Sequence, residues 1–379
     1  MGRRWPDPAT VARVAWLEKL YDIVFVACVG RFANELGANP DLRHTLVVLG
    51  WLAGLWLGWF LVTMRLNRFP DEGWLTRIIV VAQLLSTTVA AAAAISVTPL
   101  DDSAGVVATA GIGLGIAALY ATVPRDAMAD SRLLAVPIVG SVGLAVATLL
   151  SLVLSRPAAV VLTSATGLAF LVVIFAYYLP RLTRNQPVEP GHAGDRHGQL
   201  FLVLLGLSFL KVAFVTDPRT GVRYVVVVSA FAVGFALWTL YVDGVLPLGF
   251  PTDPARQQPW LAAQFVLALA VTVAAAAVTV LPVAASGAVT VAGVLLEGGS
   301  LIAVMLAFAA LALSAQHRTP RLAVSRGVWA GTFGVLMVVA VAGGMSDAAF
   351  SSVLAALIVV ASAADAIVRH GADIAAPTG

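Results

Sequence analysis

Two carboxylates stand four residues apart near the start of an otherwise apolar stretch, at Glu18 and Asp22. Residues at this spacing share one face of an α-helix. A carboxylate near the middle of a bilayer must be protonated, paired or facing water, because its insertion costs about 2.5–3.5 kcal/mol. Protonation tuned by burial would make the pair a proton relay. The alternative is a structural clamp, in which Asp22 pairs with Lys19 or either acid meets an arginine of another span.

Two more charges lie inside apolar stretches, at Arg31 and Glu297. Arg31 is too far along the helix from Asp22 to pair with it. We expect Arg31 to snorkel to the outer interface or to meet Glu297. The glycines that follow, Gly298 and Gly299, let another backbone approach closely or let the helix break. Glu297 is therefore a candidate for ion or proton coupling, and the alternative is a buried structural pair.

Three tryptophans share a broad face of one apolar stretch. Trp51, Trp56 and Trp59 fall within an arc of about 140° if the stretch is helical. Such an aromatic face can hold a cationic ligand by cation–π attraction. The alternative is that the rings serve packing or face lipid.

Polar side chains gather in two loops that we expect on the same side of the membrane. They are Asn67, Arg68, Asp71, Glu72, Arg77, His192, Asp195 and Arg196. Carboxylates suit magnesium, so the loops could bind a metal and a diphosphate, as a membrane-embedded enzyme for a lipid or isoprenoid substrate requires. Contacts that break and reform in a gate are the alternative. The sequence has no Walker A, His-Glu-x-x-His or Gly-x-Ser-x-Gly motif. We therefore lean against an enzyme and expect no metal or cofactor outside the magnesium alternative.

The composition is that of an integral membrane protein, whose main partner is the lipid bilayer. Of the 379 residues, 60% are hydrophobic and 11% charged, against about 25% charged in soluble domains. The net charge of +3 is spread over many loops, which excludes nucleic acid as a partner. The single cysteine, Cys28, can form no intrachain disulfide.

Apolar runs predict an all-α polytopic bundle of twelve membrane spans. The spans fall near residues 12–33, 45–64, 77–97, 104–123, 133–154, 158–179, 199–215, 222–242, 260–281, 287–314, 328–345 and 348–368. With both termini in the cytoplasm, most loop bases face inward, and the outer side holds Arg43, Arg156, Arg219 and Arg223. This bias predicts a multi-pass protein of the bacterial inner membrane with both termini cytoplasmic.

The two halves of the sequence resemble each other. Gln83 follows Phe69 by 14 residues, Gln264 follows Phe250 by the same distance, and each glutamine leads into an alanine-rich tract. We expect two parallel six-span repeats, in residues 1–185 and 186–379. Transporters built from repeats have their sites between the repeated parts.

The residues from Glu18 to Val26 look like the opening motif of the low-temperature-requirement A (LtrA) proteins, Glu-Leu-Phe-Phe-Asp-Leu-Val-Phe-Val. The stretch from His192 to Gly198, leading to Leu205-Gly206-Leu207-Ser208, resembles the second motif of that family. Further matches, in the family's order, are Trp56, Trp59, Asn67-Arg68-Phe69, Asp71, Glu72, Arg77 and Gln83. The resemblance is strongest over residues 10–270 and implies a membrane location and a fold, with the reaction left open. Leu207 stands where the family has glutamate and Gln264 where it often has histidine, so a chemical step at either place would be lost or moved here.

These observations favour a secondary transporter or ion-coupled permease for an unidentified small molecule or ion. Glu18 and Asp22 would be its coupling carboxylates and Glu297 a second buried acid. The alternatives are the membrane-embedded enzyme and a structural or regulatory protein whose buried charges only fix the packing of helices.

Overall fold

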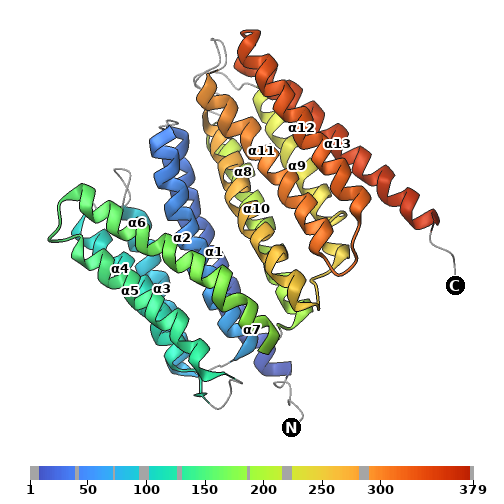
Figure 1. Cartoon of the computed structure of the whole chain (residues 1–379). Helices are drawn as coiled ribbons and strands as arrows, with labels where there is room; N and C mark the ends of the chain where they lie inside the picture. The colour runs from blue at the N-terminus through green and yellow to red at the C-terminus, as the bar shows by residue number, and fades with distance from the viewer. Residues whose placement is uncertain are drawn as a thin grey trace. The chain divides into compact units, whose positions relative to one another are not determined.

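A computed structural model describes residues 8–38, 42–70, 73–93, 102–125, 130–185, 188–215, 224–280 and 290–375. All regular structure in these ranges is helical (Figure 1), which confirms the all-α prediction. The helices are α1 (Pro8–Ala38), α2 (Leu42–Arg68), α3 (Trp74–Ala93), α4 (Ser103–Ala121), η3 (Ser131–Leu134), α5 (Ala135–Leu150), α6 (Arg156–Val173), η4 (Ile174–Tyr178), α7 (Leu179–Asn185), α8 (Pro190–Val215), α9 (Tyr224–Val242), η5 (Leu246–Leu248), α10 (Pro254–Val280), α11 (Val291–Ser314), α12 (Pro320–Ala342) and α13 (Asp347–Ala375).

Ten segments of the described chain are long and apolar enough to cross a membrane. They comprise α2 to α6 and α9 to α13, with short helical extensions at several ends. The charged helices α1 and α8, which coincide with the first and seventh predicted spans, are not among them. The protein is therefore a multi-pass membrane protein, and the count of twelve spans stays a prediction.

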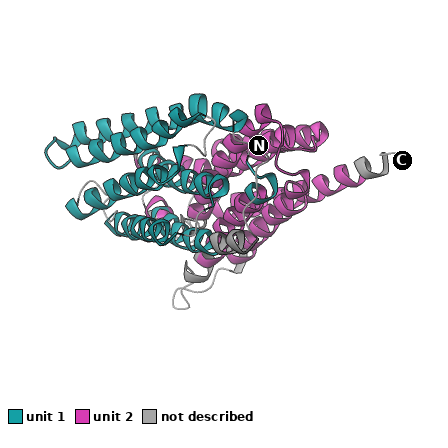
Figure 2. Ribbon diagram, turned by 90° about the horizontal axis from the view of Figure 1, so that it is seen from below, with its two compact units in different colours: residues 1–32, 46–193 teal, residues 33–45, 194–379 magenta. Residues whose placement is uncertain are grey.

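The chain forms two compact units, drawn in different colours in Figure 2. Unit 1 comprises residues 1–32 and 46–193, and unit 2 comprises residues 33–45 and 194–379. Within unit 1, α4 packs against α3 and α5, and α5 packs against α6. Within unit 2, α11 packs against α10 and α12, and α13 packs against α9 and α12. The repeat of two six-span halves remains a prediction.

Helix starts are fixed by local side-chain chemistry. The Thr290 hydroxyl accepts a hydrogen bond from the Gly293 N–H at 3.0 Å, at the first turn of α11. The Asp253 carboxylate accepts from the Ala255 N–H at 3.0 Å, just before α10. This backbone hydrogen bond, helped by Arg256, holds the pKa of Asp253 below its usual range. Such caps satisfy amide groups that have no partner inside their helix.

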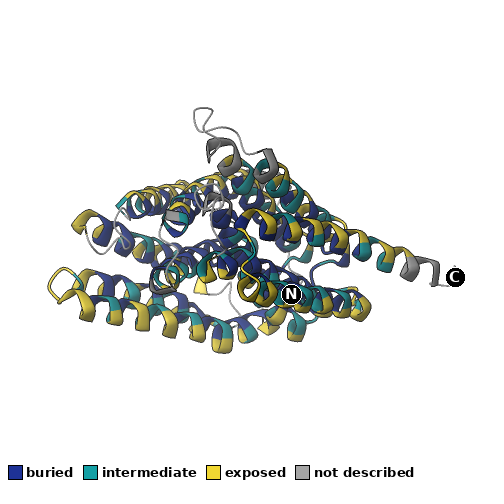
Figure 3. Cartoon of the chain, turned by 90° about the horizontal axis from the view of Figure 1, so that it is seen from above, coloured by how far each residue is buried: buried dark blue, intermediate teal, exposed yellow. Residues whose placement is uncertain are grey.

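Both units expose many large apolar side chains on their outer faces while keeping an apolar core. Figure 3 shows exposed residues along the outer faces of many helices, and large apolar side chains such as Val153, Val338 and Ile367 are exposed. Charged side chains, among them Arg65 and Arg326, are instead buried. Apolar outer faces suit contact with lipid, and buried charges in such a protein need partners inside it.

Candidate functional site

One face of α1 carries the candidate carboxylates into the interior of unit 1. Glu18 and Asp22 are only 1% and 3% exposed, and Tyr21 and Phe25 are buried beside them. The spacing of three and four residues places these side chains on one stripe of the helix. Lys19 lies on the exposed face, where its Nζ is 4.8 Å from the centre of the Trp16 ring. The sequence thus correctly predicted a shared buried face for the two acids.

Asp22 is held by a tryptophan of α2. The Trp59 indole Nε1–H donates to Asp22 Oδ1 at 2.8 Å, and the Trp59 side chain is fully buried. Trp56 is also buried and stacks on Phe60, with the ring centres 5.0 Å apart. The burial of Trp56 and Trp59 favours packing over a cation site. The third tryptophan of the predicted face, Trp51, is only partly buried.

Glu18 meets a histidine that lies 174 residues later in the chain. His192 Nε2 is 3.1 Å from Glu18 Oε2 and 3.4 Å from Oε1. The His192 side chain is 23% exposed, whereas that of Glu18 is 1% exposed. The pair therefore joins a buried carboxylate to a group that solvent can reach.

The position of His192 is set by the start of α8. Glu189 accepts hydrogen bonds through its carboxylate from the N–H groups of Gly191 and His192. The Glu189 N–H in turn donates to Asn67 Oδ1, near the end of α2, at 3.2 Å. A carboxylate at this place also suits the positive end of the helix dipole. Asn67, expected in a magnesium-binding loop, thus holds the segment that carries His192.

The two glutamines that suggested the repeat make similar hydrogen bonds. Gln83 Nε2 donates to the Tyr21 hydroxyl at 3.0 Å in unit 1, and Gln264 Nε2 donates to the Tyr241 hydroxyl at 3.3 Å in unit 2. The tyrosines come from α1 and α9, which are not equivalent in the predicted repeat. Gln264 is buried and paired, and Leu207 is buried on α8.

The remaining predicted residues make other contacts in the described chain. Glu297 accepts a hydrogen bond from the Ser351 hydroxyl of α13 at 2.8 Å. Arg31 belongs to unit 1 and is half-buried, whereas Glu297 belongs to unit 2. Among the loop candidates, Arg68 Nη1 contacts Met64 O and Sδ at 3.4 and 3.1 Å, and Arg196 Nη1 donates to Gln199 Oε1. Arg77 and Asp195 are exposed, and Asp71 and Glu72 lie outside the described residues.

Sequence reasoning missed a buried ion pair in unit 2. Arg326 Nη2 lies 2.9 Å from Asp365 Oδ2, and Arg326 Nε lies 3.2 Å from Oδ1. The same guanidinium donates to the carbonyl oxygens of Phe308 and Gly244 at 2.8 and 3.0 Å. An acid within the twelfth apolar run was the available signal, because a charge there needs a partner. Its arginine was hidden because α12 begins at Pro320, eight residues before the predicted span (328 − 320 = 8).

The chemistry available at the α1 site is proton binding and release. It combines two buried acids, an imidazole and an indole donor, from α1, α2 and the first turn of α8. No three His, Cys, Asp or Glu side chains gather as a metal site among the described residues. The magnesium hypothesis stays a prediction, since Asp71 and Glu72 fall outside those residues.

Comparison with known proteins identifies the family. The family described as bacterial low temperature requirement A protein (LtrA) matches residues 13–364, nearly the whole chain. No curated protein matches the chain, and no solved structure does. The match includes both stretches that contribute the Glu18–His192 pair. The chain therefore belongs to the bacterial LtrA family.

Proposed function

We propose that this protein is a proton-coupled secondary transporter in which Glu18 and Asp22 carry protons. The observation behind the proposal is the 3.1 Å contact between the buried Glu18 carboxylate and the partly exposed His192 imidazole. Histidine changes its charge near neutral pH more readily than other side chains. His192 would pass protons between water and Glu18.

Asp22 supplies the next step inward. It lies one helical turn beyond Glu18 on the same buried face, a rise of about 6 Å for four residues. The Trp59 N–H would hold one Asp22 oxygen in place through changes of protonation. A neutral carboxyl group is far cheaper to keep in a dry environment than a charged one. Protonation would therefore favour the state in which the acids are sealed from water, and loss of the proton the open state.

The direction of the pathway follows from the predicted topology. With both termini in the cytoplasm of an inner-membrane protein, the loop before α8 faces the cytoplasm, and His192 would be the cytoplasmic entry. The transported molecule or ion is small and unidentified, and the proposal requires no cofactor. The exchange of protons at Glu18 and Asp22 is the part of the proposal that can be tested first.

Proton flux in liposomes tests the proposal. The purified protein is reconstituted with a pH-sensitive dye inside, and a pH gradient is applied to wild type, Asp22→Asn and Glu18→Gln. We expect flux in wild type and at least a tenfold loss in both variants, because neither amide can release a proton. Asp243→Asn is the matched control, since Asp243 is exposed at the end of α9. Absence of flux in folded wild type, or equal flux in Asp22→Asn, would contradict the proposal.

A further inference from the structure

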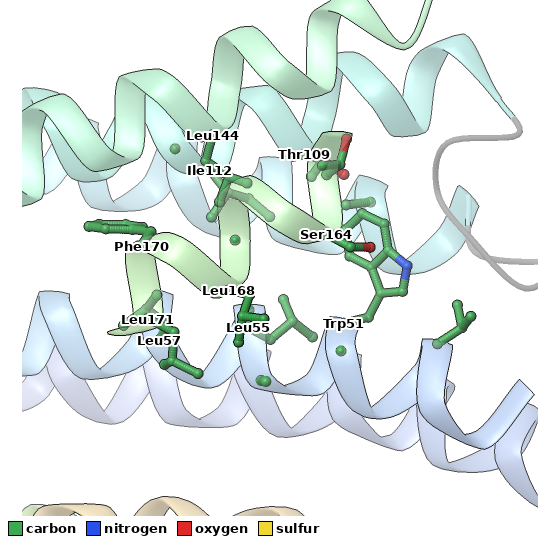
Figure 4. Close-up of a pocket in the computed structure, with 18 of the residues that line it drawn as sticks. Trp51, Leu55, Leu57, Thr109, Ile112, Leu144, Ser164, Leu168, Phe170 and Leu171 are labelled. Carbon is green, nitrogen blue, oxygen red and sulfur yellow. The ribbon is translucent and has the colours of Figure 1, made fainter. Parts of the chain in front are cut away.

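Unit 1 contains a cavity of ≈ 480 Å³ lined mainly by α2, α4, α5 and α6, with Phe32 of α1 and Ala90 and Ala91 of α3 (Figure 4). Its volume lies within the range of small-molecule sites, about 300–1,000 Å³. No charged side chain of the described chain lines it. The cavity is thus separate in chemistry from the Glu18–His192 pair, and the inference below does not depend on the proposed function.

The cavity's lining extends along two helices. Its lining runs from Leu46 to Leu57 along α2 and from Val160 to Leu171 along α6. Eleven residues of helix rise about 16 Å, roughly half of the ~30 Å hydrocarbon core of a bilayer. The cavity therefore spans the depth of about one leaflet. The helices that line the cavity along α2 and α6 are candidate membrane spans, so we expect lipid around them.

Two glycines make the space along α2. A Cβ atom added at Gly50 or Gly54 would meet no atom within 4 Å. The rest of the wall is mainly leucine, alanine and phenylalanine. Trp51 and Phe170 lie toward opposite ends of the view in Figure 4. An apolar chain suits the aliphatic part of this wall, because neither the chain nor that part of the wall has a polar group that would lose a hydrogen bond.

Four hydroxyl side chains line the cavity, those of Thr109, Ser141, Thr163 and Ser164. Thr163 is only 8% exposed, and its Oγ1 has no hydrogen-bond partner in the described chain. Ser164, its neighbour in the chain, also lines the cavity (Figure 4). Thr109 also lines the cavity, but its hydroxyl donates to the Gly105 carbonyl at 2.8 Å. The buried Thr163 hydroxyl thus lacks an acceptor that an occupant could supply.

Thr163 lies near the start of α6, which a membrane span would place toward the membrane surface. Thr163 follows Arg156, the first residue of α6, by seven positions (163 − 156 = 7), a rise of about 10 Å. A second buried hydroxyl without a partner, Ser141, lies on α5 beside Gly140, whose added Cβ would meet the Phe170 ring. Ser141 is therefore toward the deep end.

We propose that the cavity binds one acyl chain of a membrane glycerolipid. The chain would fill the apolar length along α2 and α6, and an ester oxygen at its head would accept a hydrogen bond from Thr163. Three observations support this occupant: the uncharged wall, the length of one leaflet, and a buried donor without a partner at the surface-facing end.

Native mass spectrometry of the protein purified in mild detergent tests occupancy. We expect one retained glycerolipid in wild type and at least a tenfold loss in Gly54→Leu, because the new side chain enters the cavity. Gly143→Leu is the matched control, since Gly143 is a helical glycine with the same free space that does not line the cavity. No retained lipid in wild type, equal retention in Gly54→Leu, or a retained compound without an acyl ester would overturn the proposal.

A second measurement tests the ester contact in the folded protein. Quenching by phosphatidylcholine with a brominated acyl chain is compared between wild type and Trp51→Phe, which isolates the Trp51 signal. Thr163→Val should raise the lipid concentration for half-quenching about two- to tenfold, the worth of one hydrogen bond. Ser141→Ala removes the other buried hydroxyl without a partner, at the deep end, and should leave that concentration unchanged. Equal effects of the two variants, or no effect of Thr163→Val, would refute the ester contact.

Discussion

Removal of the indole donor from Asp22 should weaken the contact between α1 and α2. The Trp59 Nε1–Asp22 Oδ1 distance is 2.8 Å, and both side chains are buried. Hydrogen bonds between helices in lipid average about 0.6 kcal/mol and reach about 1.7, whereas those to charged groups in soluble proteins reach about 1.5–3 kcal/mol. We therefore expect a coupling of about 1–2 kcal/mol between the two residues.

A double-mutant cycle measures this coupling. Unfolding free energies in a denaturing detergent are compared for wild type, Trp59→Phe, Asp22→Ala and the double variant. The packing that Trp59→Phe loses cancels in the cycle, because the substitution is made once with Asp22 present and once with Ala at that position. Tyr120→Phe with Asp22→Ala is the control cycle, because the Tyr120 hydroxyl donates to the Leu61 carbonyl at 2.9 Å. A coupling below about 0.3 kcal/mol for the Trp59 cycle, or an equal one for the control, would refute the assignment.

Two further predictions concern unit 2 and are checked by detergent denaturation. Arg326→Met alone should destabilise the protein by about 3–5 kcal/mol, because it leaves the buried Asp365 carboxylate with only the more distant Arg369, whose Nε is 4.0 Å away. The double variant Arg326→Met with Asp365→Leu should recover most of that loss of stability. If Arg326→Met alone left the unfolding free energy unchanged, the pair would carry no buried charge. Gly298→Leu should destabilise by about 1–3 kcal/mol, since an added Cβ lies 2.7 Å from Met337 Cγ. A Cβ added at Gly299 meets nothing within 4 Å, so Gly299→Leu should be close to neutral. Equal effects of the two variants would argue against the close contact at Gly298.

The sequence predicts the helices and the buried face of α1 well, because both depend on local periodicity. Each predicted apolar span coincides with a helix in the described chain. Glu18 and Asp22 share a face because residues four apart do so in any helix. That face is buried.

The partners of these acids were beyond local reasoning. His192 and Trp59 lie 174 and 37 residues from the acids they contact. Periodicity places a side chain on a face but says nothing about which helix covers that face. The resemblance to the LtrA family singled out both His192 and Glu18, and it gave no reason to bring them together. Only the three-dimensional contact between His192 and Glu18 within unit 1 does so.

The roles of Asn67 and Trp59 show a second limit. The sequence pattern groups Asn67 with the acids of its loop as a metal ligand. In the structure, Asn67 instead accepts a hydrogen bond from the Glu189 N–H, just before α8. Trp59 was grouped with a possible cation-binding face, and its N–H donates to a carboxylate. Composition of a loop or face indicates which chemistry is available, whereas three-dimensional contacts decide which is used.

Proton exchange at Glu18 and Asp22 can be observed in infrared difference spectra of the reconstituted protein during a pH step near neutrality. The proposed relay predicts a carboxyl C=O band that rises on acidification in wild type, shrinks in Asp22→Asn and shrinks in Glu18→Gln. Asp243→Asn, which alters an exposed acid, should leave the band intact. A band that is unchanged in both buried-acid variants would show that neither residue exchanges protons in this range, and would contradict the relay.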